Sequence, residues 1–412
     1  MPEAAYIVSV ARTPVGRRNG SLSKMHPADL GAVAVDACVK RSGVPGAKVD
    51  DVIFGCVSQY GAQAGNIGRT VVLSSQTLPE TVPGTTVDRQ CGSSQQAIHF
   101  AAQAVMSGTQ DVVIAGGVEV MSLVPIGSNA VDGAKHEPSR GNPFVGEAFR
   151  AKYGKRLAKY QQKMPSQFLG AELLVHKYKL TRDDLEDLAV NSHKRAAAAA
   201  KAGKFQAEIV PMQVKQEDGS FKTFAVDECI RPGTTKEKLG KLKPMFPGMG
   251  KLTPGTASQI SDGAAAVMIA NESAVKKYGL KPLAKIKAMA LCGCDPVVML
   301  EGPVFATKNV LDKAGLTIGD MDLYEVNEAF ASVPLAFQRA HKADLNKLNV
   351  NGSAMALGHP LGATGARIFT SLVHEMHRRK SKYALVSICE GGGTANATII
   401  ERCDGALPGS KL

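Results

Sequence analysis

The chain of 412 residues contains no tryptophan, and only 5% of its residues are aromatic. No stretch reaches the roughly 18 uncharged apolar residues that a membrane-spanning helix needs. The opening sequence MPEAAYIVSVARTP also lacks the layout of a signal peptide. These absences argue against a membrane or secreted protein, and we expect a soluble, intracellular chain of two or three domains.

Closely spaced cysteines are missing as well, because the eight cysteines are scattered along the chain. Without a secretory signal we expect them to be reduced thiols. Cys292 and Cys294 form a lone C-x-C with no second pair or histidine beside it. No metal site is therefore predicted.

The formal net charge of +12 comes from basic residues that are densest in 149–163, 235–243 and 377–382. Solvated helix faces are one explanation. Nucleic acid is disfavoured, because few aromatic residues interleave with the basic runs and no nucleic-acid motif is present. A small phosphorylated molecule is the better candidate for a polyanionic ligand.

The two ends of the sequence resemble each other. Segment 41–58 corresponds to 313–330, because each consists of a helix end, a linker and a strand. The strand-like segments 111–119 and 6–14 correspond in the same way to 383–393 and 283–291. Such self-similarity predicts two copies of one β-α-β unit. Alternating strands and helices indicate an α/β fold with sheets sandwiched by helices.

The first copy is interrupted where the second is not. We expect an N-terminal half at 1–122 that is completed by 254–281, and an inserted loop domain at 123–253. A C-terminal half at 282–405 and a short tail at 406–412 follow. Strand-to-helix turns from the two halves are then expected to meet at one site.

One such turn lies in TTVDRQCGSSQQAIHFAAQAV, where Cys91 stands between a strand-like and a helix-like run. An isolated cysteine is usually a small buried hydrophobe. At a helix N-terminus, however, the backbone amides favour thiolate over thiol, which is typical of a nucleophile.

The second half offers partners for this thiol. His359 lies in the corresponding turn ALGHPLGATGAR, Cys389 is delivered by the strand SICEGGG, and Asn327 follows the preceding strand in VNEAFAS. A nucleophilic thiol, a base, a second thiol and a polar amide suit a two-stage acyl transfer.

Six motifs follow one another along the chain: CGSSQQA, GGVEVMS, GTASQISDGAAAV, NEAFA, NGSAMALGHPLGATGAR and CEGGG. In this combination the sequence resembles the thiolases, which include 3-ketoacyl-CoA thiolases and acetyl-CoA acetyltransferases. The resemblance covers nearly the whole chain. It implies a five-layered α-β-α-β-α sandwich with an inserted loop domain, a homodimer or homotetramer, and CoA as co-substrate without a bound cofactor.

The resemblance also implies roles for the reactive residues. Cys91 would attack a 3-ketoacyl-CoA and carry the shortened acyl chain, His359 would take its proton, and Cys389 would shuttle a second proton. One oxyanion hole would use His359 and a water held by Asn327. The other would use the backbone amides of Cys91 and Gly391.

Contacts with CoA carry over by the same resemblance. They comprise Ser258, the backbone near Ala329 and Phe330, Met164 along the pantetheine tunnel, and Arg231 near the nucleotide. Packing or turn-capping roles are the alternatives for these residues.

The sequence departs from the family pattern at Glu390, at Thr394-Ala395 and around Met164 in KMPSQFLGAELL. These departures leave the acyl chain length open and allow a branched or steroid-like substrate.

Two other functions deserve comparison. Decarboxylating ketoacyl synthases and hydroxymethylglutaryl-CoA synthase share the duplicated architecture, but ketoacyl synthases pair their cysteine with two histidines, whereas CEGGG supplies Cys389. A non-catalytic acyl-CoA or lipid-binding relative would be expected to lose Cys91 or His359.

The last three residues are Ser410, Lys411 and Leu412. Ser-Lys-Leu at a free carboxyl end is the address that the peroxisomal import receptor reads. We therefore expect a protein of the peroxisome, or of a related organelle such as the glycosome, with a role in fatty-acid β-oxidation.

Overall fold

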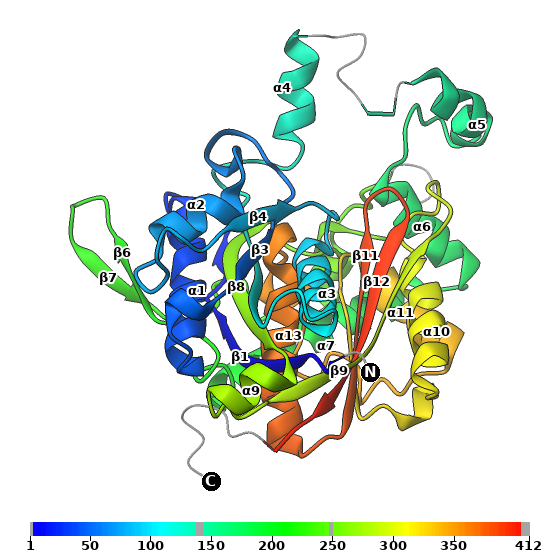
Figure 1. The fold of residues 1–412 in the computed structure, drawn as a ribbon. Coiled ribbons are helices and arrows are strands. Elements are labelled where there is room, and N and C mark those ends of the chain that lie inside the picture. Colours follow the sequence, from blue (N-terminus) through cyan, green and yellow to red (C-terminus); the bar gives the residue numbers. More distant parts are fainter. Residues whose placement is uncertain (1–2, 137–142, 145, 247–249, 405–412) are drawn as a thin grey trace.

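Both halves of the chain build one layered α/β body (Figure 1). The structure is a computed structural model that describes residues 3–136, 143–144, 146–246 and 250–404. The predicted tail therefore lies outside the described residues.

The N-terminal half supplies one set of strands. They are β1 (Tyr6–Arg12), β2 (Gly16–Arg17), β3 (Asp51–Gly55), β4 (Gly84–Val87), β5 (Val112–Val120) and β8 (Ser261–Ala270). Their helices are α1 (Pro27–Ser42), α2 (Ile67–Ser74), α3 (Ser93–Met106) and α9 (Glu272–Lys277). The strands lie in the order β1-β8-β5-β3-β4, with β2 beside β8.

The C-terminal half repeats this arrangement. Its strands are β9 (Ala284–Gly293), β10 (Leu323–Val326), β11 (Tyr383–Glu390) and β12 (Thr394–Arg402), and its helices are α10 (Gly302–Ala314), α11 (Ser332–His341), α12 (Ala354–Leu357) and α13 (Thr364–Arg379). They lie in the order β9-β12-β11-β10, and Leu348 bridges to Tyr324 where β4 lies in the first half. The repeated order confirms the predicted duplication.

The matching helix ends show why the two copies fold alike. Both α1 and α10 end at a glycine in the left-handed conformation, Gly43 with φ of 76° and Gly315 with φ of 65°. Glycine adopts this conformation without a Cβ penalty, so it stops each helix at the same point before the next strand.

The two halves join edge to edge through a short contact between β1 and β9. Tyr6 pairs with Lys285 and Ile7 with Ala284. Within the described residues this contact makes one ten-stranded sheet out of the two copies.

Three apolar clusters separate the layers. One packs α1 and α2 against the first half's strands, and another packs α10 and α11 against the second half's strands. A third lies between the halves and contains residues of α3 and α13. Figure 1 shows α3 and α13 in the middle of the body, as the five-layered sandwich requires.

The central strands are buried on both faces. Along β8, Ala264, Ala266 and Met268 face the outer cluster, whereas Val267 and Ile269 face the central one. Because successive side chains of a strand point to opposite faces, this strand reads as a continuous apolar run.

The inserted segment carries the remaining elements: α4 (Ser128–His136), α5 (Glu147–Ala158), α6 (Gln167–Lys177), α7 (Arg182–Lys201), β6 (Met212–Lys215), β7 (Phe221–Phe224) and α8 (Lys236–Gly240). Residues of α6 and α7 join the apolar cluster of the second half, whereas Leu157 of α5 packs in a smaller cluster with Leu169 of α6 and with Val297. The proposed domain boundaries stay a prediction. Among the described helices, none combines the length and the apolar character needed to cross a bilayer.

Candidate active site

Cys91 lies in the turn that leads from β4 into α3, as predicted. The turn is fixed by Ser93, whose hydroxyl accepts a hydrogen bond from Arg89 N at 2.9 Å and donates one to the Gln90 carbonyl at 2.6 Å. Gly92 then caps α3. Cys91 is thereby held at the helix N-terminus, where it packs against an apolar cluster of Val57, Met121 and Leu361.

His359 lies in the equivalent turn of the second half, between α12 and α13. Its backbone N–H donates to Ser261 Oγ at 2.7 Å, and its Nδ1 lies 2.6 Å from Thr364 Oγ1. The Thr364 hydroxyl in turn donates to the Pro360 carbonyl at 2.8 Å. Because the single hydroxyl proton is used there, Nδ1 must carry the ring proton and donate it to Thr364. Nε2 therefore carries the lone pair that can accept a proton.

Asn327 follows β10 and faces that lone pair. Its Nδ2 lies 3.3 Å from His359 Nε2, and its Oδ1 is buried without a hydrogen-bond partner in the described part of the chain. A buried amide oxygen with no partner is unusual in a folded protein, so it marks a place that can bind a further donor.

The two turns meet across a seam of glycines. A Cβ on Gly117 would lie 2.0 Å from the Gly362 carbonyl, and one on Gly55 would lie 2.7 Å from the same oxygen. Glu119 crosses the seam by accepting hydrogen bonds from Val57 N at 3.0 Å and Gly362 N at 2.8 Å. The seam places the His359 turn against β3 and β5, and Leu361 of that turn packs against Cys91.

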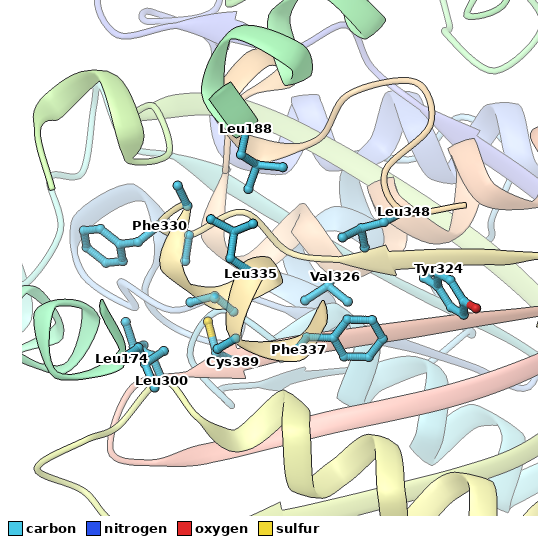
Figure 2. Close-up of a cluster of buried hydrophobic side chains, with 14 of the residues drawn as sticks. Leu174, Leu188, Leu300, Tyr324, Val326, Phe330, Leu335, Phe337, Leu348 and Cys389 are labelled. Atoms are coloured by element: carbon cyan, nitrogen blue, oxygen red, sulfur yellow. The ribbon is translucent and has the colours of Figure 1, made fainter. Parts of the chain in front are cut away.

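Cys389 reaches this site from β11. It is fully buried in the apolar cluster of the second half, where Figure 2 shows it with Phe330 and Leu335. Burial raises the pKa of Cys389 well above its usual value, and charge on Cys91 raises it further. Cys91 is thus close enough to affect the ionisation of Cys389.

The protonation states of the pair differ from the expectation for Cys91. Burial raises the pKa of Cys91 to about 12, and the neighbouring Glu390 carboxylate adds to the effect. Burial, with the charge of Arg367, lowers the pKa of His359 to about 3. The prediction that the helix N-terminus favours a resting thiolate was therefore wrong, because desolvation outweighs the helix dipole. The resting pair is a thiol and a neutral imidazole.

A cavity of about 230 Å³ opens over His359. Its lining includes Ser258, Ala329 and Phe330, three of the residues predicted to contact CoA. They are brought together by a backbone hydrogen bond of 2.9 Å from Ser258 N to the Ala329 carbonyl and by the bridge between Ala257 and Phe330. Phe330 also packs edge to face on Phe168, at 5.8 Å between ring centroids.

The other predicted contacts lie farther from the reactive groups. Arg231 is exposed and is not among the residues that line the cavity, but its Nη2 donates at 2.8 Å to Oε1 of Gln259, which does line it. Met164 is 44% exposed and is not among the residues that line the cavity. Gly391 follows β11, and a Cβ there would lie 2.9 Å from Gln90 Oε1.

Sequence reasoning overlooked Thr364, Ser261 and Glu119, which hydrogen-bond to His359 or to Gly362 of the same turn. Each lies inside one of the motifs that carry the family resemblance. Each forms a hydrogen bond with a residue that is distant in the chain or on the other side of a turn. For Thr364 the signal was a hydroxyl residue five positions after the histidine.

Comparison with known proteins agrees with this geometry. The family described as thiolase, N-terminal domain, matches residues 5–273, and thiolase, C-terminal domain, matches 280–402. A steroid 3-ketoacyl-CoA thiolase of Mycobacterium tuberculosis is 49% identical, over 97% of this chain and 94% of its own length. A 3-ketoacyl-CoA thiolase of Klebsiella pneumoniae is 40% identical, over 97% of this chain and all of its own length (100%).

Two solved structures share the fold. The acetyl-CoA acetyltransferase of Bacillus anthracis superposes with a TM-score of 0.86 at 37% identity, and human mitochondrial 3-ketoacyl-CoA thiolase with 0.85 at 40% identity. Each similarity covers 97% of this chain and 99% of the other.

Proposed function

The chain belongs to the thiolase family of acyltransferases, and on this premise we propose that it cleaves 3-ketoacyl-CoA by CoA, with Cys91 as the acylated residue. The observation that carries the assignment is that Met121 and Leu361, which pack against Cys91, line the same cavity as His359. Ser258, Ala329 and Phe330 line that cavity as well.

In the first stage His359 Nε2 takes the Cys91 proton as the sulfur attacks the keto carbon of the substrate. The bond between C2 and C3 then breaks, the shortened acyl group stays on Cys91 as a thioester, and the acetyl-CoA carbanion takes the Cys389 proton. A neutral imidazole suits this step because it can accept the proton. Thr364 accepts the hydrogen bond from Nδ1 and so leaves Nε2 as the nitrogen that accepts.

In the second stage Cys389 recovers a proton from the incoming CoA thiol. The CoA sulfur attacks the acyl carbon of the Cys91 thioester, and the bond between that carbon and the Cys91 sulfur breaks. His359 then returns its proton to the Cys91 sulfur. Run backwards, the same steps join two acyl groups.

Negative charge must develop on the substrate oxygens in both stages. Protonated His359, with a water bound by Asn327 Oδ1, suits one oxygen, and the backbone amides of Cys91 and Gly391 suit the other. Each such donor typically contributes about 3 kcal/mol of transition-state stabilisation.

We propose a bulky or branched acyl chain, including a sterol side chain, as the substrate. Support comes from the name of the mycobacterial relative and from the cavity wall, where Ile126, Phe168 and Met245 present apolar side chains. CoA itself would reach the rim near Arg231, which agrees with its polyanionic nucleotide.

A substrate panel tests the proposal. Acetoacetyl-CoA, long straight-chain and branched or steroid 3-ketoacyl-CoAs are assayed with CoA in both directions, and the acyl-enzyme is trapped with labelled acyl-CoA and mapped by peptide. We expect label on Cys91 and a preference for the bulky chains. Label on Cys389 alone would overturn the assignment of the nucleophile.

Localisation and assembly belong to the proposal as well. The peroxisomal address rests on Ser410, Lys411 and Leu412 alone, since the relatives compared are bacterial or mitochondrial. A fluorescent protein ending in GALPGSKL should enter peroxisomes, and the same fusion without the final leucine should stay in the cytosol. A homodimer or homotetramer is checked by light scattering.

A further inference from the structure

Glu390 is a buried carboxylic acid that the proposed reaction does not use. It ends β11 directly after Cys389 and has no exposed surface (0%). Its Oε2 accepts a hydrogen bond of 2.7 Å from Thr394 Oγ1, whereas its Oε1 is buried without a hydrogen-bond partner among the described residues. A buried carboxyl oxygen in this state is costly and calls for a reason.

The unpartnered oxygen faces the N-terminus of α3. A Cβ built on Gly92 would lie 2.0 Å from Glu390 Oε1, so the two residues fit only because position 92 is glycine. Gly92 caps α3 without a side-chain hydrogen bond, and the first turn of this helix contains no acidic residue. Glu390 therefore brings a carboxyl group from the opposite half to the helix end that Cys91 also occupies.

Two anions at this helix end oppose each other. A helix N-terminus carries only about half a positive charge and stabilises one nearby anion. A second negative charge in a buried site disfavours the first. Accordingly, the Glu390 carboxylate raises the pKa of both Cys91 and Cys389, in each case in addition to burial.

The groups around Glu390 do not neutralise it. Burial raises the pKa of Glu390 to about 8, against the opposing effects of the Thr394 hydrogen bond and the charge of Arg89. The titratable groups that face it from the neighbouring elements are Asp88, Arg89 and Cys91 from the turn before α3, Cys292 from β9, and Cys389 from its own strand. Arg89 is the one cation in this set.

Resting on the proposed function, we propose that the protonated form of Glu390 favours ionisation of Cys91, and that loss of this proton above neutral pH makes the nucleophilic thiolate harder to form. Glu390 is thus a positioning residue that acts through the charge at the α3 terminus. Its proton leaves to solvent, and the carboxylate then makes transfer of the Cys91 proton to His359 less favourable.

The sign of the effect is unusual. An isolated thiol becomes more nucleophilic as pH rises, because more of it is ionised. Here the pH range in which Cys91 would ionise more readily is also the range in which Glu390 becomes charged. Turnover should therefore fall above about pH 8, the value to which burial raises the pKa of Glu390.

Alkylation of Cys91 by iodoacetamide, mapped by peptide between pH 7 and pH 9.5, tests this without acyl-CoA. In Glu390→Gln, which keeps the shape of the neutral acid, Cys91 should react about tenfold faster than wild type at pH 9 and equally at pH 7. Glu401→Gln removes a carboxylate from β12, away from both thiols, and should follow wild type. Coincident wild-type and Glu390→Gln profiles would overturn the inference.

Turnover separates this inference from the proposed function. If 3-ketoacyl-CoA is cleaved but the two alkylation profiles coincide, the inference fails and the function stands. If no acyl-CoA reacts but the profiles differ as expected, the function fails and the inference stands. Should Glu390→Gln not fold, infrared titration of wild type must show a buried neutral carboxyl at pH 7 that is lost as the pH rises to 9.5; its absence at pH 7 would refute the inference.

Discussion

Replacing Thr364 by valine should disable the base while keeping the shape of the site. Valine is close to threonine in volume but cannot accept the hydrogen bond that His359 Nδ1 donates at 2.6 Å. The imidazole would then have no reason to keep its proton on Nδ1. In the other neutral tautomer Nε2 carries the proton, cannot accept one from Cys91, and opposes the Asn327 amide group 3.3 Å away.

The magnitude follows from burial. His359 is 4% exposed, so a lost hydrogen bond at Nδ1 is not replaced by bulk water. Leaving a buried donor without a partner costs about 1–3 kcal/mol. If about 2 kcal/mol of that cost appears in the transition state, kcat falls roughly 30-fold.

The assay is steady-state turnover of a 3-ketoacyl-CoA, with Thr364→Ser as the matched control because serine keeps the hydroxyl. We expect a lower kcat, a nearly unchanged KM and slower alkylation of Cys91 in Thr364→Val, with kcat recovered in Thr364→Ser. Thermal denaturation verifies that both variants are folded. A kcat within twofold of wild type in Thr364→Val would show that the hydroxyl does not set the tautomer.

Three further outcomes are expected. His359→Ala should slow the alkylation of Cys91 at neutral pH, because no base remains to take the thiol proton. Equal rates in the variant and in wild type would show that His359 is not the base for Cys91. Glu119→Ala should lower the free energy of unfolding by about 3 kcal/mol or more in urea titrations, since it strands buried donors on both sides of the seam. Burial lowers the pKa of His99 to about 3. Wild type should therefore lose stability relative to His99→Gln as pH falls below 6.5, by up to about 1.4 kcal/mol per pH unit, and parallel curves would contradict this.

The duplicated fold could be predicted because its signals are local. Apolar strands, glycine-ended helices and the spacing between them recur in both halves, so two copies of one unit could be expected. Cys91 and His359 could be found for the same reason, since each stands just before the central helix of its own copy, although His359 follows the short helix α12 rather than a strand.

The ionisation of the site could not be predicted in this way. The turn around Cys91 contains a helix N-terminus, which favours a thiolate, but burial and Glu390 come from the folded whole and reverse the balance. Thr364 looked like an ordinary helix start, and its role depends on the direction of one hydroxyl proton.

The origins of the cavity wall have a consequence for altering this enzyme. Ile126, Phe168 and Met245 come from the inserted segment, whereas the reactive groups come from the duplicated core behind the glycine seam. A library that varies only these three side chains would reshape acyl preference without disturbing the acid-base pair.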